Sequence, residues 1–164
     1  MSAIVKTAIA GELVRLTREV PAPTGALGYG RDLSCTDDVT DDLAEVDPFS
    51  YQGIAEAVIR RLTCPRGGLP DDPDYGLDLR AYCNRGVTLD ELRLLEAQIV
   101  GELGKDDRID GSTVVVSVGG EGYRTLTVAV TIVPADPALV DFTLTLAVTD
   151  RAVILEALNL AAAT

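Results

Sequence analysis

The sequence predicts an α+β domain: an antiparallel sheet of three or four strands with two core helices packed on its apolar face, plus an N-terminal helix. Segments 50–62 and 88–103 repeat apolar residues with the period of a helix, and three later segments alternate apolar and polar residues as strands do. Of the 164 residues, 47% are hydrophobic and 24% are charged. This composition is typical of a globular chain that folds without disulfides or a metal.

The first 49 residues are expected to form an arm and a connector. Residues 1–20 form the N-terminal arm, where an apolar stripe predicts a helix over 2–19. The stripe consists of Val5, Ile9, Leu13, Leu16 and Val20. Residues 21–49 form an extended acidic connector, rich in Pro, Gly and Asp, that should contain turns and extended pieces and lie against another element or another chain.

The core domain is expected to span residues 50–150 and to begin with the two helices. Ser50 or Asp47 can cap helix 50–62, whose apolar face contains Ile54, Val58 and Leu62. Helix 88–103 starts at the capping box Thr88-Leu-Asp-Glu91, and Gly104 is its expected C-terminal cap. The Pro- and Gly-rich loop between the two helices excludes a helix or long strand before Gly76.

Three strands follow, over 112–118, 123–133 and 141–149, as a meander with one apolar face and one Thr-rich face. The Thr residues proposed as interface residues on this face are Thr127, Thr131, Thr143 and Thr145. We expect the backbone rim of this C-terminal ribbon to stay unfilled until a second polypeptide joins it. The tail, residues 151–164, fits a strand over 152–158 and a short helix equally well.

Composition also excludes several classes of function. The absence of histidine rules out catalytic triads and His-ligated metals. A net charge of −12 opposes binding to nucleic acid. No uncharged run reaches the roughly 20 residues of a membrane span, and no signal peptide is evident, so we expect a protein made in the cytosol that does not bind membranes. We expect no cofactor.

Three cysteines and two acidic clusters are candidate sites. Cys35, Cys64 and Cys83 are widely spaced, and buried or half-buried thiols are favoured over a disulfide or a reactive group. The clusters, Asp37–Asp42 and Asp71–Asp78, lack the ligand order of a calcium loop, which favours a solvated acidic surface over a docking face or a metal site. No carboxylate pair stands out as a catalytic pair.

Arg60, Arg61 and Arg66 form the one basic cluster of the chain. Two interpretations remain open at this point. The first is pairing within the chain with Asp71, Asp72 or Asp74, and the second is a salt bridge to a partner protein.

The stretch Ala55–Leu79, AEAVIRRLTCPRGGLPDDPDYGLDL, resembles the baseplate wedge, or sheath-initiator, family of contractile-tail phages and related injection machines. In that family a helix ending in Arg-Leu runs into a Thr-x-x-Gly turn, a polar spacer and a Pro-x-Tyr/Phe-Gly-x-x-Leu motif. The matching residues are Arg61, Leu62, Thr63, Gly67, Pro73, Tyr75, Gly76, Asp78 and Leu79. Upstream, Gly28–Leu33 is similar to the family's entry to its first core helix, and the resemblance covers residues 27–149.

The resemblance implies a non-enzymatic baseplate component of the virion, assembled in the bacterial cytoplasm. It would link the baseplate to the tail tube and initiate sheath assembly by accepting strands from neighbouring chains, on strands 123–133 and 141–149. Its partners would be other wedge proteins, tube subunits and sheath subunits, in a six-fold assembly with several copies of the chain.

Residue by residue, the resemblance implies that Arg61, Pro73, Tyr75, Gly76 and Asp78 form the interface loop. Tyr75 would anchor the loop to the helices and Gly76 would supply a positive φ. Two other hypotheses stay open: a regulatory binding module similar in fold to a stress anti-adaptor, and a carboxylate-based peptidoglycan hydrolase.

Overall fold

The computed structural model describes residues 32–33, 45–83, 85–119 and 125–161. The chain divides into two compact units, residues 1–57 and 58–164. The expected N-terminal helix 2–19, Cys35 and the acidic cluster Asp37–Asp42 lie outside the described residues. The α+β fold class is confirmed for the described part, which contains two α-helices and a four-stranded antiparallel sheet.

In the first unit, two pieces of the predicted connector are extended. Strand β1 (Asp32–Leu33) pairs with β2 (Glu45–Val46) in an antiparallel ladder. Helix α2 (Tyr51–Thr63) begins in this unit and ends in the second. The Ser50 hydroxyl accepts a hydrogen bond from the Gly53 amide at 3.0 Å, and the Asp47 carboxylate accepts one from the Phe49 amide at 3.0 Å. Both predicted capping residues therefore bind backbone amides at the start of this helix.

In the second unit, a short 3₁₀-helix η1 (Leu79–Tyr82) precedes helix α3 (Leu89–Leu103). The predicted capping box of α3 is confirmed, because Thr88 accepts from the Glu91 amide and Glu91 accepts from the Thr88 amide. Gly104 caps the C-terminus as expected, with right-handed backbone angles (φ −65°). Leu95, Ile99 and Leu103 are fully buried, so one stripe of α3 faces the core.

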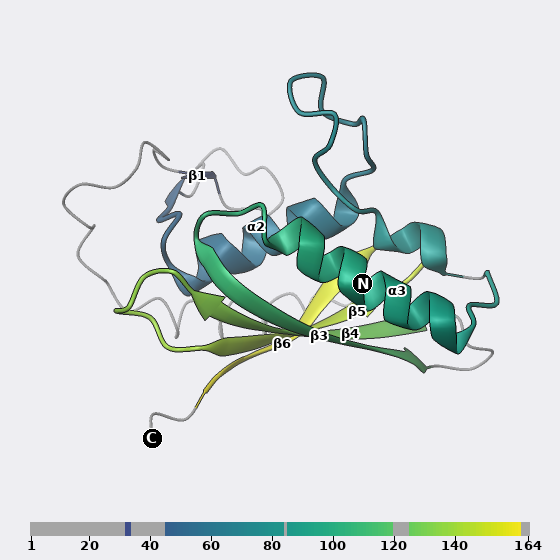
Figure 1. Cartoon of the computed structure of the whole chain (residues 1–164). Coiled ribbons are helices and arrows are strands. Elements are labelled where there is room, and N and C mark those ends of the chain that lie inside the picture. The colour runs from purple at the N-terminus through teal and green to yellow at the C-terminus, as the bar shows by residue number, and fades with distance from the viewer. Residues whose placement is uncertain (1–31, 34–44, 84, 120–124, 162–164) are drawn as a thin grey trace. The chain divides into compact units, whose positions relative to one another are not determined.

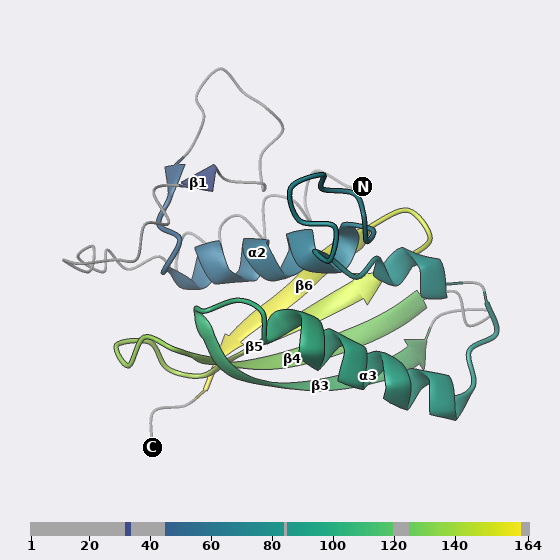
Figure 2. The ribbon, with the colours of Figure 1, turned by 45° about the horizontal axis from the view of Figure 1, so that its top comes forward.

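The sheet has the strand order β3-β4-β5-β6, in which all neighbours are antiparallel. The strands are β3 (Ile109–Gly119), β4 (Thr125–Pro134), β5 (Phe142–Val148) and β6 (Val153–Leu160). The three predicted strands are confirmed, and the tail resolves as a strand. Figures 1 and 2 show α3 lying along one face of this sheet, on the β3 side.

One expectation about the sheet is wrong. Strands 123–133 and 141–149 were expected to offer a free backbone rim, but β4 pairs with β3 and β5, and β5 pairs with β4 and β6. The chain's own tail therefore fills the rim of β5, and the central strands cannot accept a strand from another chain. Among the described strands, the sheet edges are β3 and β6.

Candidate functional site

The loop that carries the family resemblance is braced at its base and exposed along its length. Residues 65–74 are all exposed, whereas Gly76, Leu77 and Leu79 are buried. In Figure 1 this teal segment projects from the body between the end of α2 and η1. Two backbone hydrogen bonds close it, from the Gly67 amide to the Pro73 carbonyl and from the Leu77 amide to the Arg61 carbonyl, each at 2.8 Å.

Glu102, on the last turn of α3, holds the base of this loop. Its side chain is 0% exposed and accepts hydrogen bonds from the Gly76 amide at 2.8 Å, the Lys105 ammonium at 2.7 Å and the Arg61 guanidinium at 3.3 Å. The Arg66 guanidinium lies 3.6 Å from the second carboxylate oxygen. One buried carboxylate therefore joins the end of α2, the loop and α3.

A second buried pair, Asp106 and Arg108, lies between α3 and β3. Arg108 donates to Asp106 from Nε at 2.8 Å, from Nη2 at 2.7 Å and from its backbone amide at 3.1 Å. The Arg61 Nε lies 3.7 Å from Asp106. Arg61 is thus placed between two buried carboxylates, which balances charge in a low-dielectric region.

These contacts correct the expected role of the basic cluster. Arg61 and Arg66 pair within the chain, but with Glu102 and, for Arg61, also with Asp106, and not with the loop aspartates Asp71, Asp72 or Asp74. A carboxylate 41 positions after Arg61 gives no local signal in the sequence. One sequence feature could have pointed to this pairing. Glu102 and Asp106 lie at the C-terminal end of a helix, where a carboxylate is unfavourable unless a cation neutralises it.

Of the five proposed residues, the structure brings Arg61, Tyr75 and Gly76 together at the base of the loop. Pro73 and Asp78 make other contacts. The Arg61 guanidinium lies 4.6 Å from the centre of the Tyr75 ring, so Tyr75 anchors the loop to α2 as expected. Gly76 has φ +96°, as predicted, and a Cβ there would collide with the Cys64 carbonyl oxygen. Pro73 accepts the hydrogen bond that closes the loop.

Asp78 has a capping role. It accepts from the Arg80 amide at the start of η1 and forms an ion pair with the Arg80 side chain at 2.7 Å. Arg80 in turn donates to the Thr63 carbonyl at the end of α2, at 2.9 Å. Asp78 therefore braces the exit of the loop.

The four proposed threonines form a second group on β4 and β5, on the sheet face opposite the buried apolar one. Thr131 and Thr143 are directly opposite each other, and their hydroxyls lie 3.0 Å apart. Thr127 faces Ala147, and Thr145 faces Ala129. All four side chains are half-buried. They can contact a partner through their side chains, since their backbone groups are used inside the sheet.

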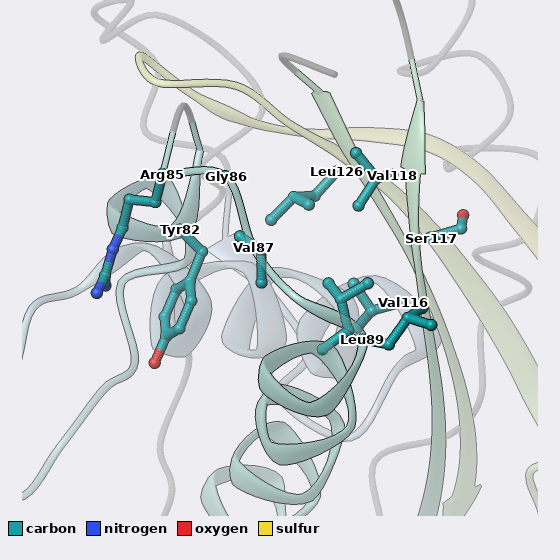
Figure 3. A pocket seen from close by; sticks show the side chains of 10 residues that line it. Tyr82, Arg85, Gly86, Val87, Leu89, Val116, Ser117, Val118 and Leu126 are labelled. Carbon is teal, nitrogen blue, oxygen red and sulfur yellow. The ribbon is translucent and has the colours of Figure 1, made fainter.

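A hollow of about 700 Å³ lies between the start of α3, the end of β3 and the start of β4 (Figure 3). Its lining is mostly apolar, including Val87, Leu89, Val118 and Leu126, and Arg85 stands at its margin beside Tyr82. No carboxylate belongs to the described lining. The described lining therefore supplies neither the acid nor the base that glycoside hydrolysis needs.

Other candidate chemistry is limited in the described part of the chain. Cys64 is half-buried and Cys83 is buried, and both are free thiols, as expected. Burial raises the pKa of Cys83, which lowers its reactivity. No cluster of metal-ligating side chains occurs among the described residues. Nor does any helix described here have the length and apolar character needed to cross a membrane.

No model of a known protein family matches the chain, and no curated protein matches it.

We expect the loop brace to weaken in acid. Burial alone would raise the pKa of Glu102, but Lys105, the Gly76 amide and Arg61 outweigh it and hold the pKa below the ordinary value of 4.5. Burial would likewise raise the pKa of Asp106, but Arg108 outweighs it, so this pKa is also lowered. The pKa values of Glu102 and Asp106 are therefore lower in the folded chain than in the unfolded chain. The two carboxylates stabilise the fold above about pH 4.5, and this stabilisation is lost as the pH falls through their folded-state pKa values.

Urea unfolding of the wild type and of Glu102→Gln, followed from pH 7 to about pH 2, measures this effect. The difference in unfolding free energy between the two proteins should shrink on acidification. A difference that stays constant with pH would show that the charge of Glu102 does not stabilise the fold.

Proposed function

We propose that this protein is a structural component of a contractile phage-tail baseplate, which links the baseplate to the tail tube and initiates sheath assembly by strand addition. It has no catalytic role in this proposal. Its partners are other wedge proteins, tube subunits and sheath subunits, and it is present in several copies in a six-fold assembly in the virion.

The observation that carries the proposal is the convergence of the motif residues. Arg61, at the end of α2, and Gly76, in the loop, come from different segments and both donate hydrogen bonds to the buried carboxylate of Glu102. The Tyr75 ring, next to Gly76, lies against the same Arg61 guanidinium. Two members of a chance string of turn-forming residues would not be expected to bind the same buried carboxylate. The brace instead holds a ten-residue loop, 65–74, in the exposed position that a contact with another subunit requires.

The edge strand β6 offers the backbone groups for strand addition. The Ala161 amide donates to the Asp141 carbonyl on the β5 side at 2.7 Å. Because successive amides of a strand point to opposite sides, the Leu160 amide points away from β5, toward the edge. Leu160 is 39% exposed. A bulge at Glu156 interrupts the pairing, so the regular edge available to a partner begins at Ala157.

The opposite edge, β3, is less suited to strand addition. The Glu96 carboxylate on α3 accepts a hydrogen bond from the Val116 amide at 2.9 Å. A side chain of the same chain thus occupies an edge-facing amide in the middle of β3, which is a common protection against edge-to-edge pairing. The geometry therefore favours β6 as the assembly edge.

Replacing Leu160 with proline should stop sheath initiation while leaving the fold intact. Proline removes the edge-facing amide, and the β5–β6 hydrogen bonds do not use that amide. Leu160→Ala is the matched control, because it shortens the side chain and keeps the amide. Baseplates assembled with each variant are mixed with the tube and sheath subunits encoded by the same genome, and sheath length is measured by electron microscopy.

Normal sheaths on baseplates that contain Leu160→Pro, with the variant folded by circular dichroism, would contradict strand addition at β6. Loss of sheath with both variants would assign the effect to the side chain instead. The genes that flank this one are an independent check, since those of a wedge protein should encode tube, sheath and spike proteins.

A further inference from the structure

One face of the sheet is built from three rows of directly opposed residues, and we call it the open face. It is the face opposite the buried apolar side chains of the sheet. The rows are Thr113–Thr131–Thr143–Asn159, Val115–Ala129–Thr145–Ala157 and Ser117–Thr127–Ala147–Ile154. In the second unit, α3 lies against the other face (Figure 2).

No residue in these rows is charged, although 24% of the chain is. A water-exposed face of this size with the average composition of the chain would carry about three charged side chains. Exposure is greatest at the two edges: Val115 on β3 is 59% exposed, and Thr113, Ser117 and Asn159 are also exposed. The residues of the rows on β4 and β5 are half-buried, except Ala147, which is buried. An uncharged face on a chain of net charge −12 is a candidate for a surface that another protein covers.

We propose that a second copy of this chain covers the open face, through a two-fold, face-to-face contact of the two sheets. Two copies of so acidic a chain repel each other, and the open face is where they can approach without bringing like charges together. Threonine and serine hydroxyls both donate and accept hydrogen bonds. The same surface can therefore be complementary to itself, as a two-fold interface requires.

The size of the open face fits a weak but specific dimer. Four strands about 4.8 Å apart and three rows about 6.8 Å apart along the strands give a projected area of roughly 400 Å². Side chains roughen this surface, so face-to-face packing would bury on the order of 600 Å² from each copy, near the lower limit of stable interfaces. We expect such a dimer to dissociate in the micromolar range. The proposal does not depend on the baseplate function, because β6 strand addition uses backbone groups at the edge.

Sedimentation equilibrium of the full chain between about 5 and 200 µM tests the proposal. The variants are Val115→Glu on the open face and Leu94→Glu on α3. Both parent side chains are 59% exposed, so each variant adds one charge at an equally exposed apolar position. We expect the wild type and Leu94→Glu to dimerise alike, and Val115→Glu to dissociate at least about tenfold more readily, because each copy would bring one unpaired charge into the contact.

Salt provides a second readout. Raising NaCl from about 0.05 to 0.5 M should tighten the dimer, since screening reduces repulsion between the two acidic chains and the contact itself has no ion pairs to weaken. A wild type that stays monomeric over this range would overturn the proposal. So would equal effects of the two variants, or a dimer that dissociates as salt rises.

Discussion

Gly76→Ala is expected to lower the free energy of unfolding of the loop-bearing unit by about 3 kcal/mol or more. The backbone at Gly76 has φ +96°, which costs an alanine about 1–2 kcal/mol by itself. A Cβ would also collide with the Cys64 carbonyl oxygen, a backbone atom that cannot turn aside. Relief of the collision would move the Gly76 amide away from Glu102 and open the brace.

Gly67→Ala is the matched control for this substitution. Gly67 also has a positive φ, +76°, but nothing lies within 4 Å of the position of its Cβ. It should therefore show the backbone cost alone, about 1 kcal/mol. Urea unfolding of both variants measures the difference. Equal losses would mean that the close approach to Cys64 has no energetic consequence.

Glu102→Gln is expected to have the second large effect, a loss of about 2–4 kcal/mol at neutral pH. Glutamine keeps the size and one acceptor oxygen, so the variant isolates the charge. Arg61 and Lys105 would lose their buried counterion, and Arg61 would retain Asp106. Because the loop base depends on this carboxylate, the Gly76 amide should also exchange with solvent faster than in the wild type.

Asp71→Asn, on the exposed part of the same loop, is the control for loss of one negative charge. It should change stability little, since exposed charges contribute little. Hydrogen exchange of the Gly76 amide and urea unfolding together test the two variants. Unchanged exchange at Gly76 in Glu102→Gln would show that the hydrogen bond to this side chain does not hold the loop.

Local pattern was sufficient for most of the elements. Three patterns predicted their elements: the capping box Thr88–Glu91, the apolar stripe of α3, and the alternation along β4 and β5. Each involves residues only a few positions apart, so it can be recognised in the order of amino acids alone. The positive φ of Gly76 and the anchoring of Tyr75, both expected from the family resemblance, are also present. A positive φ suits a turn glycine because glycine has no Cβ to strain the backbone there.

Long-range pairing required the folded chain. The partners of Arg61 are two of 26 acidic residues, and no local spacing distinguishes Glu102 and Asp106 from the others. The sequence of the tail is equally compatible with a helix and with a strand. In the folded chain it pairs with β5 as strand β6, so the free edge of the sheet is β6 and not β5. Propensity acts between neighbours in sequence. The energy of a buried ion pair or a strand ladder comes instead from segments that meet only after folding, so the tertiary structure decides which groups are buried and which stay available to a partner.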